Sequence, residues 1–568
     1  MVQTSKKSPQ AKLTEEIGMN TSVLILGGGW TGIKAASELA DLGYGVILVD
    51  DSTRLGGDAP LDHLVSSNGD RLSTLMESVN AHEAIETLVS TRLVSLTGVP
   101  GDYRVRLQQD DKVFERSVGA VIVALEAENV CLAREYGLRQ AENVLSQSDI
   151  EALFAAAGED KQWPGDGFKD VVFVVGLHNE QNPLVMERTI RSALEVQLVN
   201  RCQATVLVNN VKLAEAGLEA LYKRSRETGV LYFKLREQPK IIQNGSNLRI
   251  HFFDTVLHHD VELTPDVLVV EETFRPHSEA IRVAQVLGID TDSEGFLQPN
   301  NVHFFPVRTT REGIYVIGSA RQPCNLTEGW TDVANTVLEI RQLFRESTKL
   351  MPVEKVTVHR GKCTLCLTCV RVCPHNAISW VNRAVISTVA CQECGICASE
   401  CPMDAIQLVA YRDDQIEAQI LASMDKEADG PRMIVFCCQN SAYEAAKMAQ
   451  AFQMSAPDGL QTIKVPCAGK VDVDHILKAF QAGADGVLVL TCHTDNCKSQ
   501  HGNTFAQWRV EDGRRMLSEV GLEEDRLGFA TIASNMPVEF VRITREMEVK
   551  LNQLGPSRIS RIRRQAAA

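Results

Sequence analysis

The sequence predicts a multidomain α/β protein, and three observations support that class. The chain has 568 residues and 44% hydrophobic content, and one core does not extend over such a length, so about three or four domains are expected. Short β-branched runs alternate with helical stretches over residues 21–349 and again over 433–554, which is typical of largely parallel sheets covered by helices. Between them lies a compact cysteine repeat, which indicates a smaller α+β domain.

Charge and hydropathy exclude several classes of protein. The net charge of -15 argues against a nucleic-acid binder, because neutralising phosphates requires an extended basic face. No stretch of about 18 apolar residues is present, and the N-terminus lacks the apolar segment of a secretion signal. We therefore expect a cytoplasmic protein, with any membrane association made through partner proteins. Thiols stay reduced there, so clustered cysteines indicate metal or redox sites.

Composition also predicts where the domains begin and end. A second α/β unit is expected inside the first. Its first strand is expected at DVVFVVG and its last at PDVLVVEETFRP. The charged stretch after the cysteine repeat suggests a helix and a linker, and SRISRIRRQ a solvated tail. The expected parts are a flexible leader (1–18), a first α/β domain (19–350) with its inserted unit (about 165–276), a cysteine-repeat domain (351–412), a linker (413–431), a C-terminal α/β domain (432–554) and a basic tail (555–568).

The first domain opens with a dinucleotide-binding pattern. In TSVLILGGGWTGIKAASELADLGYGVILVD, an expected strand is followed by Gly27, Gly29 and Gly32, then by a helix and a second strand ending at Asp50. These glycines allow a tight turn, a close approach of a pyrophosphate and tight helix packing. Asp50 stands where a carboxylate accepts hydrogen bonds from a ribose.

Two further segments favour FAD over NAD and carry a family resemblance. They are LGG, with Gly56 and Gly57, and EGIYVIGSA, with Gly318 and Ser319. Together these motifs resemble the two-dinucleotide-binding flavoproteins of Rossmann type. The resemblance implies that Gly318 lies near the flavin phosphates or ribityl chain, with Ser319 where many relatives carry Asp.

The same comparison exposes departures from that family. Ala124-Leu125-Glu126 replaces the usual A-T-G, and whether Glu126 weakens FAD binding is left open by the sequence. In the second unit, Glu271-Glu272-Thr273 stands at the corresponding place, and the first strand leads into Gly176-Leu-His-Asn without a GxGxxG pattern. Direct NAD(P)H oxidation there is not expected.

The cysteine repeat contains two copies of CxxCxxCxxxCP. Zinc is the alternative metal for these cysteines. Zinc sites, however, use four cysteines in two pairs, whereas each copy offers three close cysteines and a distant fourth. The pattern is that of bacterial ferredoxins with two [4Fe-4S] clusters, in which the fourth cysteine of each copy ligates the other cluster. That resemblance implies two ligand sets: Cys363, Cys366, Cys369 and Cys401, and Cys391, Cys394, Cys397 and Cys373.

The C-terminal domain delivers cysteines to one edge of its expected sheet. Cys437 and Cys438 follow MIVF, Cys467 follows TIKVP, and Cys492 follows GVLVLT, with Cys497 shortly after. Ligands of open α/β sheets gather at the carboxyl ends of the strands. Inert buried thiols explain one such cysteine but poorly explain five. Four thiolates suit a [2Fe-2S] centre or, as the alternative, zinc.

The order of these modules resembles a known combination. The flavin and ferredoxin modules resemble the iron–sulfur flavoprotein of heterodisulfide reductase (the HdrA family), and VPCAGKVDVDHILKAFQAGADGVLVLTCHTDNC resembles the delta subunit of methyl-viologen-reducing hydrogenase (MvhD). Fusions of this kind also resemble the QmoB component of the quinone-interacting membrane-bound oxidoreductase. By this resemblance Cys438, Cys467, Cys492 and Cys497 hold a [2Fe-2S] cluster, with Cys437 as a substitute, because Ser441 replaces one expected thiol.

The predicted function is that of an electron-transfer subunit in an oxidoreductase complex of anaerobic energy metabolism. FAD exchanges electron pairs with one-electron clusters, and no catalytic side chain is required. The resemblance implies other oxidoreductase subunits as partners, heterodisulfide-reductase-like or quinone-linked, with homodimerisation or a second flavoprotein, and leaves electron bifurcation as a hypothesis. Two alternatives are a stand-alone NAD(P)H-dependent reductase and a scaffold with a vestigial flavin site.

Overall fold

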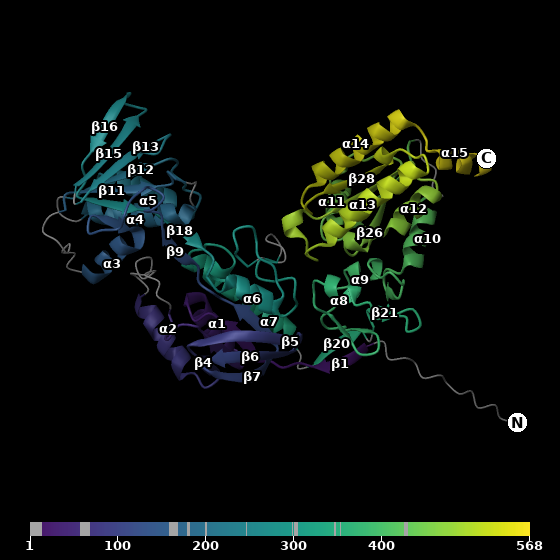
Figure 1. Cartoon of the computed structure of the whole chain (residues 1–568), viewed down its shortest axis with the longest axis horizontal. Helices are drawn as coiled ribbons and strands as arrows, with labels where there is room; N and C mark the ends of the chain where they lie inside the picture. The colour runs from purple at the N-terminus through teal and green to yellow at the C-terminus, as the bar shows by residue number, and fades with distance from the viewer. Residues whose placement is uncertain are drawn as a thin grey trace.

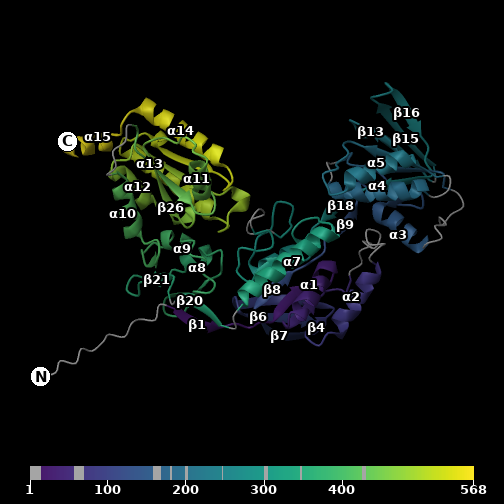
Figure 2. The same cartoon turned by 180° about the vertical axis from the view of Figure 1, so that it is seen from behind.

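The computed structural model describes most of the chain. Described residues are all except 1–13, 57–68, 158–167, 179–181, 199–201, 246, 298, 300–304, 346–347, 353, 425–429 and 568. The inserted second unit and the C-terminal domain lie at opposite ends of the molecule, with the first domain and the cysteine-repeat domain between them (Figures 1 and 2). The predicted multidomain α/β class is confirmed.

The first domain is built on a parallel sheet in the order β19-β8-β2-β3-β4. Its strands are β2 (Val23–Leu26), β3 (Val46–Val49), β4 (Ile85–Leu88), β8 (Ala120–Val123) and β19 (Ile314–Val316). One face packs on helices α1 (Trp30–Asp41), α2 (Gly69–Ala81) and α7 (Leu326–Leu343). The other face packs on the antiparallel strands β5 (Thr91–Val99), β6 (Asp102–Gln109) and β7 (Lys112–Val118) and on α6 (Ala280–Leu287). Because both faces are covered, β2, β3 and β8 are buried throughout, as expected of continuous apolar runs.

The second unit begins earlier than its expected start near residue 165. Its parallel sheet has the order β10-β17-β11-β12-β13, and its first strand is β10 (Val144–Ser146). The other strands and helices are α3 (Gln147–Ala157), β11 (Asp170–Val175), α4 (Pro183–Leu198), β12 (Gln203–Val208), α5 (Leu218–Thr228), β13 (Leu231–Lys234) and β17 (Val267–Val270), with an antiparallel layer of β14 (Lys240–Asn244), β15 (Asn247–Asp254) and β16 (His259–Leu263). Two antiparallel strands, β9 (Glu128–Cys131) and β18 (Glu272–Arg275), join the unit to the first domain. The three-residue strand β10 is too short to give a clear pattern, which explains the late boundary.

The cysteine-repeat domain has two small antiparallel pairs. They are β21 (Val356–Val358) with β24 (Ile406–Leu408) and β22 (Ile378–Trp380) with β23 (Ala384–Ile386), accompanied by helices α8 (Thr368–Val372) and α9 (Ile396–Ser399). The leader predicted over 1–18 needs correction, because β1 (Thr14–Gly18) pairs with β20 (Thr348–Pro352). The rest of that leader lies outside the described residues.

The C-terminal domain has a four-stranded parallel sheet in the order β26-β25-β27-β28. Its strands are β25 (Met433–Cys438), β26 (Leu460–Val465), β27 (Gly486–Thr491) and β28 (Leu527–Thr531), of which β28 was not predicted, and its helices are α10 (Asp413–Met424), α11 (Ala442–Ala451), α12 (Val473–Gln481), α13 (Gly502–Glu519), α14 (Pro537–Leu554) and α15 (Arg558–Ala567). The helix expected in the charged stretch is α10, but it is part of this domain and not of a linker, because its Ile416, Ile420 and Met424 belong to the core. The basic tail forms α15, which starts beside the buried Ser557 and Ser560 and is therefore not wholly solvated.

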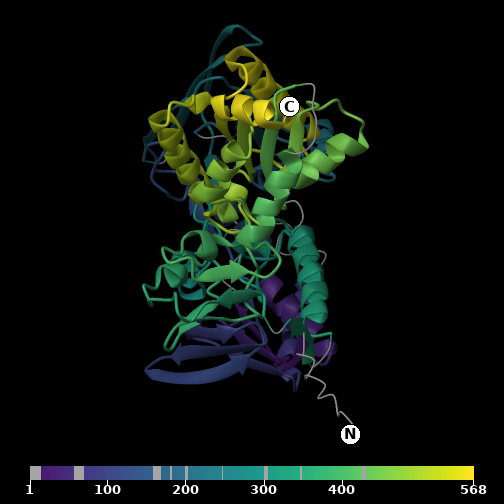
Figure 3. The ribbon, with the colours of Figure 1, turned by 90° about the vertical axis from the view of Figure 1, so that its right-hand side faces the viewer.

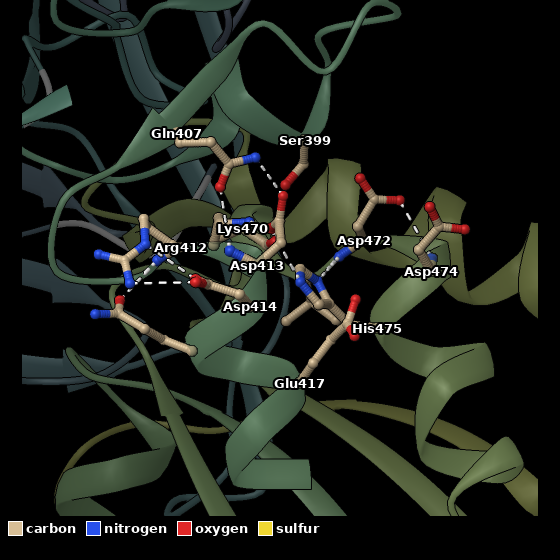
Figure 4. A network of polar contacts seen from close by, with 12 residues as sticks. Ser399, Gln407, Arg412, Asp413, Asp414, Glu417, Lys470, Asp472, Asp474 and His475 are labelled. Carbon is tan, nitrogen blue, oxygen red and sulfur yellow. Dashed lines mark hydrogen bonds and ion pairs between the residues drawn. The ribbon is translucent and has the colours of Figure 1, made fainter. Parts of the chain in front are cut away.

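A buried polar network joins the last two domains, which stack on one another (Figure 3). At its centre, Asp413 pairs with the Lys470 ammonium and accepts a hydrogen bond from His475 Nε2 at 3.1 Å (Figure 4). Lys470 is only 1% exposed, so this ion pair is shielded from water on the lysine side. Gln407 of the cysteine-repeat domain donates to Asp413 Oδ2 at 2.5 Å, and Ser399 donates to the Lys470 carbonyl at 2.8 Å.

Hydrogen bonds to Asp413 stabilise its charged form. Burial alone would raise the pKa of Asp413, but the hydrogen bonds from His475, Lys470 and Gln407 outweigh burial and hold that pKa well below its ordinary value. A second link reinforces the junction, because Arg509 donates to the Gly469 and Val471 carbonyls at 2.7 and 2.8 Å and pairs with Glu400. The two domains are thus held in one fixed contact.

Replacing Asp413 is expected to open this junction. Asp413→Ala leaves the Lys470 ammonium buried without its counter-ion, which should cost about 2 to 3 kcal/mol. Hydrogen–deuterium exchange of peptides covering residues 470–481 measures the loss as reduced protection. Asp414→Ala is the matched control, because Asp414 is 69% exposed and its ion pair with Arg412 lies at the surface. Equal protection in both variants would contradict the assigned role of Asp413.

Candidate functional site

The predicted glycine turn is formed at the end of β2. Gly27 has φ +110°, and a Cβ there would overlap the Ala124 carbonyl that follows β8. A Cβ on Gly32 would overlap the Gly27 carbonyl, so the start of α1 packs tightly on the turn. Both positions therefore require glycine for the reasons that the dinucleotide pattern implies.

The acidic residue at the end of β3 is tied to the same turn. Asp50 Oδ2 accepts a hydrogen bond from Gly28 N at 2.5 Å, and Oδ1 accepts from Ser52 N at 2.8 Å. Gly56 N donates to the Gly28 carbonyl at 2.8 Å, which brings the predicted LGG segment against the turn. Gly57 lies outside the described residues.

The late segment also reaches the start of α1. Gly318 has φ +61°, and a Cβ there would lie 2.7 Å from Thr31 Cγ2. Gly318 N donates to Asp332 Oδ2 at 3.0 Å, while the Ser319 hydroxyl accepts from Ala127 N at 3.0 Å. Asp332 of α7 was not predicted as a site residue. Its carboxylate is buried beside Gly318. Helix α7 therefore brings an acidic side chain to this segment, whose position 319 carries Ser where many relatives carry Asp.

A carboxylate occupies the N-terminal end of α1. Glu126 Oε1 accepts a hydrogen bond from Trp30 N at 2.8 Å, and a Cβ on Gly29 would overlap this carboxylate. Burial raises the pKa of Glu126 to about 7, against the lowering effect of the Trp30 hydrogen bond, and Asp50 raises it further. The glycine expected to admit a pyrophosphate therefore admits the Glu126 side chain in this structure.

A cavity of about 600 Å³ opens beside this helix end, within the usual size range of ligand pockets. Gly27, Gly29 and Asp50 line it on one side, and Ser148 and Glu272 of the second unit line it on the other. Six carboxylates and two arginines line the cavity: Asp50, Asp51, Glu126, Glu128, Glu272, Glu279, Arg92 and Arg282. The volume of the cavity suits a dinucleotide, whereas the excess of carboxylates in its lining disfavours binding of the negatively charged pyrophosphate.

The second unit has a similar arrangement that closes its own phosphate position. Glu271 Oε2 accepts from Gly176 N at 2.7 Å, and Glu271 Oε1 accepts from the Tyr136 hydroxyl at 2.6 Å. Burial raises the pKa of Glu271. Because Gly176 N already has an internal acceptor, the loop after β11 offers no free amide at that position, in keeping with the missing glycine pattern.

The structure brings the eight cysteines of the repeat together as two groups. Cys363, Cys366, Cys369 and Cys401 line one small cavity. Cys397 lies near Cys373, Cys391 and Cys394, the other members of the second expected set, and also near Cys369 of the first set. Backbone amides point at several sulfurs: Ala377 N donates to Cys373 Sγ and Glu393 N to Cys391 Sγ, both at 3.4 Å.

The two copies share the same unusual backbone conformations. Left-handed residues occur two, four and thirteen positions after the first cysteine of each copy: Leu365, Leu367 and Asn376, then Glu393, Gly395 and Asp404. For a residue with a side chain this conformation costs roughly 1 kcal/mol or more, so its repetition indicates a shared structural requirement. Loops wrapped around two similar groups of sulfurs meet that requirement.

Four cysteines of the C-terminal domain form a third group. The sulfurs of Cys438 and Cys492 lie 3.6 Å apart, Cys438 also contacts Cys467, and Cys497 contacts both Cys467 and Cys492. Cys437 is not among them. Neighbouring residues of a strand face opposite ways, so Cys437 packs in the core with α11 and α14, whereas Cys438 faces the α12 and α13 side.

The second and third cysteine groups are separated by very little protein. A Cβ on Gly469 would lie 2.7 Å from Ile396, the residue before Cys397. Gly469 also packs on Gly502. A Cβ on Gly502 would in turn overlap Cys467 Sγ. The absence of side chains at these two glycine positions therefore allows the two groups to approach each other.

The second group also lies against the first domain. His375 Nδ1 hydrogen-bonds the Thr310 carbonyl at 2.6 Å, and Gln392 donates to Glu312 at 3.3 Å. Gln500 of the C-terminal domain donates to the Thr310 hydroxyl at 3.3 Å. All three domains therefore meet beside the Cys373–Cys391–Cys394–Cys397 group. Cys366 of the first group, in contrast, is exposed.

Glu126 is expected to make the stability of the flavin-free chain depend on pH. Its pKa is about 7 when folded and 4.5 as an ordinary carboxyl, so the folded state binds the proton more tightly between these values. Stability should therefore rise as pH falls from 8 to 5, by roughly 2 to 3 kcal/mol relative to Glu126→Gln. Urea unfolding of both proteins at several pH values measures this difference, and parallel pH profiles would contradict it.

Comparison with known proteins agrees with this arrangement. Residues 433–555 match the family described as methyl-viologen-reducing hydrogenase, delta subunit, and residues 356–379 match the 4Fe-4S binding domain. The A component of the ferredoxin:CoB-CoM heterodisulfide reductase of Methanosarcina mazei is 22% identical, over 96% of this chain and 82% of that protein. The D component, an iron–sulfur protein, of the vhu F420-non-reducing hydrogenase of Methanocaldococcus jannaschii is 34% identical, over 22% of this chain and 95% of that protein.

Among solved structures, thioredoxin reductase of Lactococcus lactis is 17% identical, covers 57% of this chain and 98% of its own, and has a TM-score of 0.40. The fold of the first domain is defined by the order of the strands in its own sheet. Similarity to the A component of heterodisulfide reductase extends across the chain, and the protein is accordingly an iron–sulfur electron-transfer protein. Its residues 433–555 belong to the family of methyl-viologen-reducing hydrogenase delta subunits.

Proposed function

We propose that the chain conducts electrons between FAD in the first domain, two [4Fe-4S] clusters in the ferredoxin-like domain and a [2Fe-2S] cluster in the C-terminal domain. The observation that carries this proposal is the meeting of all three domains beside one cysteine group, with Ile396, Gly469 and Gly502 between that group and Cys467. Electrons pass between centres only where little protein separates them. The packing of three redox modules around one point favours a single conducting path.

FAD is assigned to the cavity of about 600 Å³ beside α1. Gly27, Gly29 and Gly32 would receive its pyrophosphate and Asp50 its ribose, with Gly56 and Gly318 closing around them and Ser319 beside Ala127. When bound, FAD supplies the exchange between electron pairs and single electrons. The turn and the cavity fit this cofactor, while the Glu126 carboxylate stands in the position that the pyrophosphate needs.

The ligand sets follow the three groups of sulfurs. One [4Fe-4S] cluster takes Cys363, Cys366, Cys369 and Cys401, the other takes Cys373, Cys391, Cys394 and Cys397, and the [2Fe-2S] cluster takes Cys438, Cys467, Cys492 and Cys497. The close contacts among the last four support a compact centre, and the orientation of Cys437 weighs against its being a ligand of that centre.

The position of each cluster suggests its place in the path. The cluster of Cys373 is central, because it lies against both the first and the C-terminal domains. The cluster of Cys366 faces outward, and Leu365 and Met403 beside it are 37% and 44% exposed. We assign this outer cluster to exchange with a partner protein.

Partners are inferred from the relatives, whose names identify them as subunits of larger enzymes. A heterodisulfide-reductase-like partner is proposed, in the cytoplasm. None of the helices in the described part of the chain has the length and apolar character needed to cross a bilayer. The closed phosphate position at Gly176 weighs against a stand-alone NAD(P)H-dependent reductase.

Cofactor counts test the whole assignment. Protein purified without oxygen should contain about ten irons, from two clusters of four and one of two, and one FAD per chain. Iron, acid-labile sulfide and extracted flavin are measured on the same sample. A content of about eight irons per chain would show that the third cluster is absent. Protein with neither iron nor flavin would overturn the proposal.

The pair Cys437 and Cys438 offers a sharper test of the third centre. Cys438→Ser should remove or alter the [2Fe-2S] signal and leave both [4Fe-4S] signals, whereas Cys437→Ser should keep all three, because its side chain faces the opposite core. Electron paramagnetic resonance of the reduced proteins separates the signals. Loss of the [2Fe-2S] signal only in Cys437→Ser would show that the ligand assignment is wrong.

A further inference from the structure

At the N-terminal end of α1, a side chain of the protein occupies the place where a phosphate group of a ligand is expected. In a dinucleotide-binding turn the first amides of the helix and the positive end of its dipole receive a phosphate. Here Trp30 N donates to the Glu126 carboxylate at 2.8 Å instead. The side chain reaches this amide from the end of β8, 96 residues away along the chain, so the contact is a feature of the tertiary fold.

The space for this carboxylate is provided by Gly29. A Cβ at Gly29 would overlap both the carboxylate and its stem, so Glu126 lies flat against the glycine backbone. A pyrophosphate approaching the same amides would contact the same surface. A pyrophosphate and the Glu126 carboxyl cannot share that surface, because both need the same donor, and above about pH 7, where Glu126 is ionised, they also repel each other.

The two arginines of the cavity offset only part of the negative charge, because six carboxylates line it. Arg282 is paired with Glu279 at 2.5 Å, and Arg92 donates to the neutral Gln108 at 3.1 Å. The indole N–H of Trp30 is also buried without an acceptor within the described part of the chain. The helix start therefore has one donor held by Glu126 and a second donor without a partner.

We propose that Glu126 is an internal competitor for the pyrophosphate of FAD, so that flavin binds only when the Glu126 side chain leaves the end of α1. This inference rests on the assignment of FAD to this cavity. It makes Glu126 the residue that sets flavin affinity, and it predicts that the chain holds FAD more weakly than the same turn would hold it without the carboxylate.

Three variants of the full-length chain test the competition. Glu126→Gly removes the competing group and should bind FAD at least about tenfold more tightly than the unmodified protein, since a buried repulsion is lost. Glu126→Gln keeps the shape and an acceptor for Trp30 N but removes the charge, so it should fold normally and give a smaller gain of about threefold to tenfold. Glu271→Gln is the matched control, because it changes a buried carboxylate that also accepts from a backbone amide, but in the second unit, and should leave FAD affinity unchanged.

The measurement is titration of flavin-stripped protein with FAD, followed by flavin fluorescence, together with the FAD content of each protein as purified. Circular dichroism verifies that each variant is folded. Equal affinity of the unmodified protein, Glu126→Gly and Glu126→Gln would overturn the competition while leaving the FAD assignment intact. Absence of FAD binding in every folded protein would instead overturn the FAD assignment itself, and the competition with it.

Discussion

Electron transfer through this protein depends on short separations between its redox groups, and the contact at Ile396, Gly469 and Gly502 provides one of them. A Cβ at Gly469 would overlap Ile396 of the ferredoxin-like domain, and a Cβ at Gly502 would overlap Cys467 Sγ within the C-terminal domain, so both glycines are needed for the close packing at this junction. The Asp413–Lys470 pair and Arg509 hold the same junction, where burial makes each ion pair hard to break without loss of stability. Rigid domain contact and close cysteine groups are therefore two aspects of one interface.

The flavoprotein region has kept its turn geometry while filling its anion positions from within. Glu126 is the third residue after β8 and Glu271 the first after β17, and each accepts a hydrogen bond from a backbone amide that follows the neighbouring parallel strand. In both cases burial raises the pKa of the carboxyl. At Glu271 the Tyr136 hydroxyl adds a second donor, so that carboxylate is held more firmly than Glu126. The difference explains why the first unit remains the better candidate for a flavin.

Errors in the predicted boundaries have a common physical origin. The strand β1 pairs with β20, more than 300 residues later in the chain, and nothing in the composition of TEEIG announces that partner. The charged stretch containing α10 was expected to be a helix and a linker outside the C-terminal domain, yet Ile416, Ile420 and Met424 lie on one face of that helix and enter the C-terminal core. Local composition describes how a segment meets water, but long-range pairing decides whether one of its faces is buried.

The sequence by itself determined the class of domains, the two cysteine repeats and the glycine turn, because these depend on local spacing: a turn needs glycine at fixed positions, and thiolates in one loop are placed by their separation along the chain. Tertiary structure alone decided the rest. It decided that Cys438, and not the alternative Cys437, lies with the expected Cys467, Cys492 and Cys497, and it brought Asp332 to Gly318. It also set Glu126 on the end of α1. Each of these contacts joins strands and helices distant in sequence, so no local pattern could have fixed their distances.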